Sequence, residues 1–334
     1  MKLQTYNNCV FCGSKKMKII KNQSFKHNFY TLAIKNDFNL KDNFFSKMKV
    51  YNCQKCYIIQ NNPWFSFDDT FKIFNEIYGQ HNRNWNNVLK FFKKGELPNH
   101  GDLFSLLNKI IQIKKYAEFN SPFMGLMLNF FYEDHKNNNK IFFEKIFSSA
   151  LNYLFIRQQA GLSKNQIKKN TKLAKEYFIT LNNLKQKKKK NSPKIFKTLI
   201  VDNSHLSWLY NDNYKSVNSR SLASGLFDIK VKKFNKNEKR ILYDLFGIFH
   251  TLDHTHQPKN ILDYALKNSK YVIVYCHVDN ELEKQHLFSL SDKFITYLKN
   301  QNIKVLNLTD KINKNYNSPE QYFLCSKNHK LPKL

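Results

Sequence analysis

The chain has 334 residues and a formal net charge of +30 at pH 7, and 42% of its residues are hydrophobic. Length and apolar content together predict a folded protein of about two domains, which excludes a disordered basic tail. No apolar run approaches the ~20 residues that a membrane-spanning helix needs, and the first residues lack the pattern of a signal peptide. We therefore expect a cytoplasmic protein without a membrane span.

The excess of positive charge normally indicates a nucleic acid or another anionic partner. The chain is also rich in Lys, Asn, Ile, Phe and Tyr and has only 8 Gly and 7 Pro, which is typical of an AT-rich genome. Its lysines are scattered, apart from a dense run at 185–194. Nucleic acid is therefore not the favoured partner, although the charge does not exclude it. A basic surface would equally attract a substrate that carries phosphate.

Four of the six cysteines form two C-x-x-C pairs: Cys9 with Cys12, and Cys53 with Cys56. Each pair can hold two thiolates on one tight turn, and two such turns complete the tetrahedral shell of a Zn²⁺ ion. Gly13 follows the first pair, where such a turn requires a positive φ. Core cysteines or a redox pair are the alternatives. Because sulfur would fill every position and exclude water, we predict a structural zinc ion in a module at 1–65.

Apolar periodicity after the module predicts a helical connector at 66–115, with helices over 68–79 and 101–115. A short strand is expected at 116–119, and a basic helical insertion at about 130–195. The remainder alternates between strand and helix patterns, which is typical of α/β proteins. Strands are predicted at 197–202, 228–234, 243–250, 271–278, 303–309 and 321–327, and the last of these is expected at the sheet edge. Helices are predicted at 258–268 and 289–302, and a short helix or turn at 219–227. The predicted fold class is α/β, with a Rossmann-like sheet domain over 116–334 behind the small N-terminal module.

One stretch, FHTLDHTHQP at 249–258, gathers His250, Asp253, His254 and His256. It could form a metal site, an acid/base cluster or the rim of a pocket. A metal site is not favoured, because the four residues share one turn and metal-binding histidines usually have partners from elsewhere in the fold. Ligands of an α/β sheet gather beyond the carboxyl ends of its strands, and this stretch begins where a predicted strand ends. We therefore interpret it as a pocket rim.

Several phrases occur in the same order as in a known family. They are CVFCG at 9–13, YNCQKCYIIQNNP at 51–63, IYGQH at 77–81, FHTLDHTHQPKNIL at 249–262 and EKQHLFSLS at 283–291. In these phrases the chain resembles the class I S-adenosylmethionine-dependent methyltransferases that carry an N-terminal zinc domain, the group containing nucleotide-sugar C-methyltransferases. Asp253 stands where that family has Glu, and Gln285 where Glu is usual. The resemblance implies methyl transfer to a sugar, nucleotide sugar or sugar-derived small molecule, as in surface polysaccharide synthesis.

The resemblance also implies a site for S-adenosylmethionine. The family carries a glycine-rich turn after the first strand, and this chain has no such run. Glu118 and Gly125 stand near the two ends of the best substitute, with Asn120 between them, and Asp202 would then bind the ribose hydroxyls. The stretch around Asp202 is the alternative place for the turn. His250 would lie near the adenosine, with Leu252 packed beneath it.

The resemblance implies that His286 is the general base. An imidazole of near-neutral pKa suits removal of a proton before in-line methyl transfer. Tyr78 and His81 would shape the acceptor pocket or assist the proton transfer. The alternatives without a catalytic role are that His286 is a loop histidine facing solvent, and that Tyr78 and His81 belong to an ordinary helix end. Two alternative functions remain: a catalytically inactive, methyltransferase-like scaffold, which the missing glycines favour, and a basic RNA-associated zinc protein.

Overall fold

The structure is a computed structural model, and it describes 1–20, 29–41, 43–66, 69–70, 73, 101–119, 126, 196–201, 217–221, 242–249, 252–278, 282, 286–312 and 320–334. The predicted insertion at about 130–195, the strand at 228–234 and most of the connector at 66–115 lie outside these residues. In the described part, no helix combines the length and apolarity that crossing a bilayer would take.

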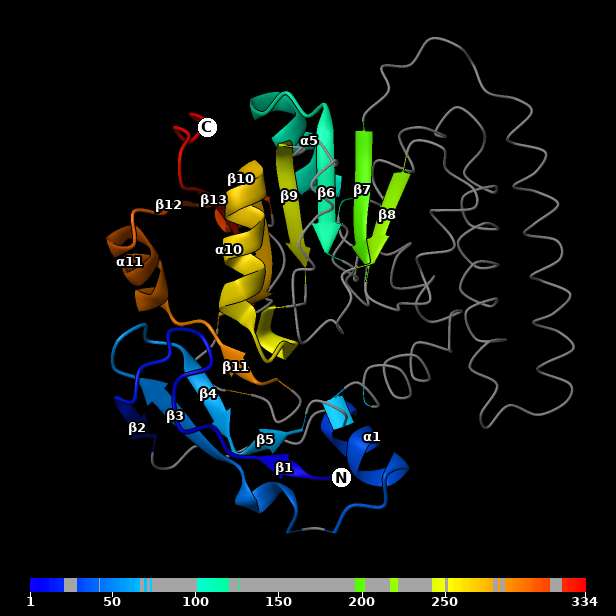
Figure 1. The fold of residues 1–334 in the computed structure, drawn as a ribbon, viewed down its shortest axis with the longest axis vertical. Helices are drawn as coiled ribbons and strands as arrows, with labels where there is room; N and C mark the ends of the chain where they lie inside the picture. Colours follow the sequence, from blue (N-terminus) through cyan, green and yellow to red (C-terminus); the bar gives the residue numbers. More distant parts are fainter. Residues whose placement is uncertain are drawn as a thin grey trace, which may run out of the picture.

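A seven-stranded sheet forms the centre of the larger part of the molecule, in the order β12-β13-β10-β9-β6-β7-β8 (Figure 1). Its strands are β6 (Lys115–Phe119), β7 (Phe196–Val201), β8 (Val217–Ser221), β9 (Tyr243–Phe249), β10 (Ser269–His277), β12 (Lys304–Asn307) and β13 (Glu320–Ser326). Pairing is parallel from β10 to β8, whereas β13 is antiparallel to both β10 and β12. The sheet is therefore an α/β, Rossmann-like sheet whose strand order reverses at β6.

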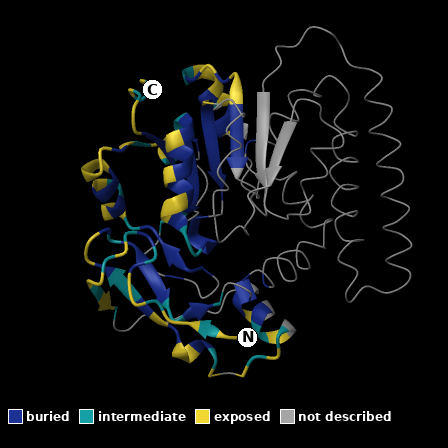
Figure 2. Cartoon of the chain, viewed as in Figure 1, coloured by how far each residue is buried: buried dark blue, intermediate teal, exposed yellow. Residues whose placement is uncertain are grey.

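The central strands form because they are continuous apolar runs, as expected for a parallel sheet covered on both faces. Every residue of β9 is buried, and so is most of β10 (Figure 2). Helix α10 (Pro258–Asn268) begins with Pro258, whose fixed φ suits a first turn, and it lays an apolar face on β9 and β10. The predicted helix at 258–268 is confirmed at both ends.

Two sequence predictions about the sheet are wrong. The last strand, expected at the edge, is β13, and it lies between β10 and β12. Its core residues are buried on both sides of the pleat, whereas β12 is short, half-exposed and forms the actual edge. Strand β8 occupies 217–221, where a short helix or turn is expected from residue 219. Periodicity did not show either placement, because it reports burial and not the order of pairing.

The N-terminal module contains a second sheet, in the order β11-β4-β3-β2, beside a small β1-β5 pair. Its elements are β1 (Leu3–Gln4), β2 (Met17–Ile19), helix α1 (Phe29–Asp37), the 3-10 turn η1 (Phe45–Lys47), β3 (Lys49–Cys53), β4 (Ile59–Asn62) and β5 (Trp64–Phe65). Strand β11 (Phe288–Ser289) comes from the far end of the chain and pairs antiparallel with β4. The module is therefore completed by a strand more than 220 residues away in sequence.

One hydrophobic core runs from the module into the sheet domain. Phe11 packs edge-on against Phe294 of helix α11 (Asp292–Asn300), with ring centroids 4.9 Å apart, and it also meets Phe288 and Tyr297. In Figure 1 the arrowheads of β9, β6, β7 and β8 point toward the module. The module therefore lies on the carboxyl-end side of the parallel strands, the side on which α/β proteins bind their ligands.

A buried carboxylate fixes the other end of the sheet. Asp244 of β9 accepts hydrogen bonds from the backbone N–H groups of Lys114 and Lys115, each 2.9 Å long, at the start of β6. Its second oxygen lies 2.8 Å from Lys270 Nζ. Burial alone would raise the pKa of Asp244, but these hydrogen bonds and the lysine charge lower it below its usual value. The carboxylate thereby holds β6, β9 and β10 in register.

Replacing Asp244 by Asn is expected to lower the free energy of unfolding by roughly 1–3 kcal/mol, because two backbone N–H groups and Lys270 lose a charged acceptor. Since the pKa of Asp244 is lowered on folding, its contribution is complete above the unfolded pKa of about 3.9 and is lost as pH falls through the folded value. Urea unfolding at pH 7 and pH 3 measures both effects. The matched control is Asp263→Asn, which removes an exposed i,i+4 pair with Lys259 and is expected to cost under about 0.5 kcal/mol. An equal cost at both pH values would contradict the assignment.

Candidate functional site

The two cysteine pairs fold into equivalent turns. In the first, Gly13 N–H donates to Cys9 O at 2.9 Å, and in the second Tyr57 N–H donates to Cys53 O at the same distance. Both residues that follow the pairs are left-handed, Gly13 with φ 69° and Tyr57 with φ 63°. Glycine meets this requirement at no steric cost, whereas Tyr57 does so under strain. The sequence indicated only the first of these turns through its glycine.

The turns bring all four thiols together, as the spacing predicts. Cys9 Sγ lies 3.5 Å from Cys56 Sγ, and Cys12 Sγ lies 3.5 Å from Cys53 Sγ, with all four sulfurs within 4.8 Å of one another. Sulfurs around a tetrahedral zinc ion with bonds of about 2.3 Å would lie about 3.8 Å apart. Backbone N–H groups of Cys12 and Lys55 also point at Cys9 Sγ and Cys53 Sγ, at 3.5 Å and 3.4 Å. The four cysteines therefore fit a structural zinc ion.

The protonation of the cluster also suits a dication. Hydrogen bonds from the thiols of Cys56 and Cys9 lower the pKa of Cys53, whereas the same contacts raise the pKa of Cys56. The pKa of Cys9 is raised as well, first by its contact with Cys53. The contacts between the sulfurs therefore favour the thiolate form of Cys53. A zinc ion would offset half of the charge of four thiolates and bond to each sulfur, so its binding would stabilise the folded module.

A second cluster surrounds Asp253, at the carboxyl-end edge of the sheet. Asp253 and His254 lie in η4 (Leu252–His254), the 3-10 turn after β9, and His277 is the last residue of β10. His286 precedes β11, and Glu320 is the first residue of the antiparallel β13. Four separate segments therefore place one side chain or more at the same point, on the side of the sheet where the module lies.

The distances show that Asp253 is the centre of this cluster. Its Oδ2 lies 2.7 Å from His277 Nδ1 and 3.8 Å from His286 Nε2, and its Oδ1 lies 3.9 Å from His254 Nε2. The ring of His286 lies between the other two, with centroids 4.4 Å from His254 and 4.1 Å from His277. His277 Nε2 in turn lies 3.3 Å from Glu320 Oε1. The imidazoles surround a single carboxylate.

Asp253 has no exposed surface, and His254 and His286 are also buried. Burial raises the pKa of Asp253, but the charges of His254 and His286 and the hydrogen bond to His277 outweigh it and lower the pKa well below its usual range. Asp253 is thus an ionised, dehydrated carboxylate. Such a group is costly unless positive charge or hydrogen-bond donors compensate it.

The N-terminal module fixes the position of His286. Asn61 of β4 donates from Nδ2 to His286 O at 2.8 Å, and its own N–H donates to Leu287 O at 2.8 Å. Leu287 N–H donates to Asp253 O at 2.7 Å. The adjoining Gln60 and Asn62 bond the module internally, to Val10 and Tyr6. The polar phrase QNNP at 60–63, which the sequence marked only by resemblance, therefore ties the module to the Asp253 cluster.

The stretch at 249–258 divides between two environments. Asp253 and His254 belong to the cluster, whereas His256 faces the module, where its Nδ1 meets Tyr6 Oη at 2.6 Å and its Nε2 meets Thr70 Oγ1 at 3.2 Å. His250 lies outside the described residues. The sequence analysis grouped His250, Asp253, His254 and His256 and did not single out His277. The position of His277 near the end of a predicted strand could have indicated it.

Of the predicted cofactor residues, the structure describes two. Glu118 is buried near the carboxyl end of β6, where it accepts a hydrogen bond from Tyr116, and β6 lies where the strand order reverses. Leu252 is buried at the start of η4. Asn120, Gly125 and Asp202 lie outside the described residues, as do Tyr78 and His81. Glu118 and Leu252 thus lie at the ends of the two strands, β6 and β9, between which the strand order reverses.

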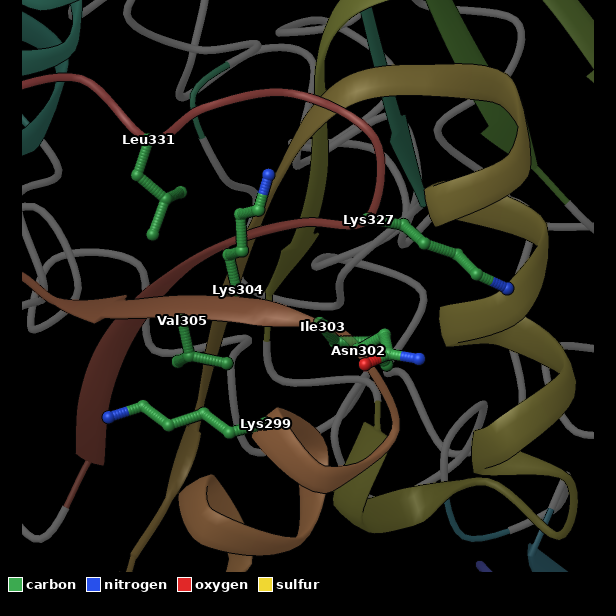
Figure 3. Close-up of a pocket in the computed structure, with 7 residues that line it drawn as sticks. All are labelled: Lys299, Asn302, Ile303, Lys304, Val305, Lys327 and Leu331. Atoms are coloured by element: carbon green, nitrogen blue, oxygen red, sulfur yellow. The ribbon is translucent and has the colours of Figure 1, made fainter.

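A depression of about 470 Å³ lies at the edge strand β12, lined in part by Lys299, Lys304, Lys327 and Leu331 (Figure 3). All three lysines are exposed, and their ammonium groups point away from one another in the close-up. The polar side chains that line it are not buried. We interpret it as a surface hollow with solvated charges, in contrast to the buried cluster at the carboxyl-end edge.

No family model and no curated protein matches this chain. Among solved structures, a Klebsiella pneumoniae protein described as an O-methyltransferase is 12% identical, with a TM-score of 0.31, over 73% of this chain and 89% of that one. The METTL16 MTase domain is 11% identical, with a TM-score of 0.27, over 61% of this chain and 92% of that one. Likeness at this level leaves the function to be inferred from the chain itself.

Replacing Cys56 by Ser is expected to abolish the tightly held zinc, because one of four sulfurs in a buried shell is lost. Zinc released by a thiol-modifying reagent measures this directly. Cys276→Ala is the matched control, since Cys276 is equally buried but is not one of the four clustered sulfurs. That variant should keep about one thiol-released zinc ion per chain. Retention of the ion by Cys56→Ser would contradict the four-sulfur shell.

Replacing Asn61 by Ala is expected to lower the free energy of unfolding by roughly 1–3 kcal/mol, because the buried carbonyl of His286 loses its donor. Denaturant unfolding measures the change. Asn307→Ala removes an exposed amide that bonds Gln321 and should cost under about 0.5 kcal/mol. Equal costs for the two variants would show that the contact between Asn61 and His286 does not hold the module to the cluster.

Proposed function

We propose that the chain is an S-adenosylmethionine-dependent methyltransferase that acts on a sugar or a sugar-derived small molecule. The order of the sheet carries the proposal. Numbered along the chain, its strands lie in the order 3-2-1-4-5-7-6, with only the seventh reversed. This is the sheet expected of a class I methyltransferase, and the antiparallel strand inserted between the fifth and sixth distinguishes it from other doubly wound sheets.

The cofactor would bind beyond β6 and β9, in the crevice at the reversal point. Glu118 near the end of β6 and Leu252 after β9 lie on its two sides. Bound there, S-adenosylmethionine would supply the methyl group on a sulfonium. The protein's own contribution is to orient the acceptor and to remove water from the crevice, which the module beside this edge favours.

His286 is the residue that we propose to activate the acceptor. Its Nε2 faces Asp253, a buried carboxylate that can orient the imidazole and stabilise its protonated form. Its backbone is fixed from both sides, by Asn61 of the module and by the turn that carries Asp253. The alternative was a loop histidine that faces solvent without a catalytic role. Such a histidine would not be buried in this way.

The acceptor class rests on the resemblance and on charge. The zinc turns and the phrase Leu252-Asp253-His254 are the parts that resemble enzymes acting on nucleotide sugars. A net charge of +30 favours an acceptor that carries phosphate, such as a nucleotide sugar, because it raises the local concentration of anions. RNA binding remains the alternative that the same charge suggests, and its affinity would fall steeply with salt.

Isothermal titration calorimetry of the full chain with S-adenosylmethionine tests the proposal. We expect a dissociation constant well below 1 mM, because the crevice at the strand ends is formed by elements that the sheet holds in place. The absence of binding at millimolar cofactor would contradict the enzyme and favour a scaffold.

Replacing His286 by Asn tests its role once an acceptor is identified from candidate nucleotide sugars. We expect a fall in kcat of about 100-fold or more with cofactor binding unchanged, because removal of a general base costs about that much. The control is His329→Asn, whose histidine lies next to the C-terminus, beyond β13. Unchanged kcat in His286→Asn would remove His286 from the reaction.

A further inference from the structure

We propose that Asp253, His277 and His286 form a second metal site, for a divalent cation of the first transition row. The site lies at the carboxyl-end edge of the sheet and is built from different residues than the cysteine shell. Binding of the cation does not depend on methyl transfer. Only its use in the reaction rests on the proposed function.

The three donors come from separate segments and converge. Asp253 Oδ2 lies 2.7 Å from His277 Nδ1 and 3.8 Å from His286 Nε2, and the three ligand atoms all lie within 4.8 Å of one another. Donors that share one cation at bonds of about 2.1 Å lie about 3.0–4.2 Å apart, so shifts of a few tenths of an ångström close the shell. This convergence is what the turn at 249–258 could not supply from its own residues.

The contacts of His277 fit a cation bound at Nδ1. Its Nδ1 faces Asp253 and its Nε2 faces Glu320 Oε1 at 3.3 Å, so both ring nitrogens meet carboxylate oxygens. A neutral imidazole carries one N–H and can donate to only one of them, whereas a protonated ring, or a ring with a cation on Nδ1, satisfies both carboxylates. With a cation on Nδ1, the Nε2–H donates to Glu320. Metal-binding histidines commonly make such a bond to an outer carboxylate, which fixes the tautomer.

The charge of the cluster also calls for a cation. Asp253 has no exposed surface, and its Oδ1 accepts no hydrogen bond within the described part of the chain. Among the described residues, His254 Nε2 lies 3.9 Å from that oxygen, which is beyond hydrogen-bonding distance. Glu320, a second carboxylate, stands only one imidazole away from Asp253. A dication would balance the buried carboxylate of Asp253 and the partly exposed one of Glu320, and it would supply a partner for Oδ1.

The donor set selects the kind of cation. Two imidazoles and one carboxylate suit Zn²⁺, Fe²⁺ and their neighbours, whereas Mg²⁺ and Ca²⁺ prefer shells made of oxygen. Three protein donors leave open positions, which distinguishes this site from the closed cysteine shell. His277 and Glu320 are the partly exposed members, so the site opens on their side. An oxygen of the acceptor would fit an open position, and His286 would then act as a ligand instead of a base.

Cobalt titration of the zinc-loaded full chain tests the proposal. Zinc would hold the four clustered thiolates, and Cys276 and Cys325 are buried, so added Co²⁺ is expected to meet nitrogen and oxygen donors. We expect one equivalent to bind, with visible d–d bands and without the intense sulfur-to-cobalt charge transfer that a cysteine site gives. Thiol-released zinc is measured in the same samples, to establish that the cysteine shell stays filled.

Variants locate the bound cobalt. Asp253→Asn and His277→Gln should each lose the bound cobalt and keep the thiol-released zinc. Glu320→Gln should weaken cobalt binding about 10–100-fold without abolishing it, because it alters only the partner of a ligand. His329→Asn is the matched histidine control and should bind as the parent does. His277 is partly exposed, so its variant tests the site even if Asp253→Asn fails to fold.

If the zinc-loaded chain binds no cobalt at millimolar Co²⁺, the proposal is overturned. Cobalt binding that both His277→Gln and Asp253→Asn retain would overturn it as well. Calorimetry with S-adenosylmethionine on the same preparations separates this proposal from the proposed function. Cofactor binding without cobalt would leave an acid/base cluster around Asp253 in a methyltransferase. Cobalt binding without cofactor would leave a metal site in a protein of another function.

Discussion

The burial of one ionised carboxylate, Asp253, is the constraint on which the rest of the site depends. A charge without exposed surface has to be compensated by neighbours, and this chain supplies them from three segments at the carboxyl-end edge: the turn after β9, the end of β10 and the segment before β11. The compensation consists of histidines, whose charge and coordination can change near neutral pH. An arginine or lysine would have neutralised the carboxylate permanently. The cluster is therefore built for proton or metal chemistry.

The same constraint explains why the zinc module cannot be treated as an appendage. The backbone that carries His286 bonds on one side to Asn61 of the module and on the other to the turn of Asp253, and β11 completes the module's sheet. Phe11, inside the first cysteine turn, packs on α11 of the sheet domain. A metal ion held by the four cysteines would thus be connected to the cluster by one strand pair and one shared core. We infer that its role is to hold the carboxyl-end edge in shape.

The sequence predicted what depends on local spacing. The C-x-x-C pairs predicted the four-sulfur cluster, and Pro258 with the apolar pattern after it predicted α10 to the residue. The sequence did not predict what depends on pairing between distant segments. His277 and His286 lie 24 and 33 residues after Asp253, and only the parallel pairing of β9 with β10 and the return of β11 bring them together. His256 was wrongly grouped with the cluster for the same reason. It lies next to Asp253 and His254 in sequence, but in space its neighbours are Tyr6 and Thr70.

The central claim is that the edge around Asp253 is the reaction centre of a methyltransferase. A crystal structure of the full chain with S-adenosylhomocysteine tests it most directly. We predict that the adenosine lies beyond the ends of β6 and β9, and that the sulfur faces a space bordered by Asp253 and His286. A ligand bound elsewhere on the chain, or a sulfur separated from His286 by packed side chains, would contradict the claim.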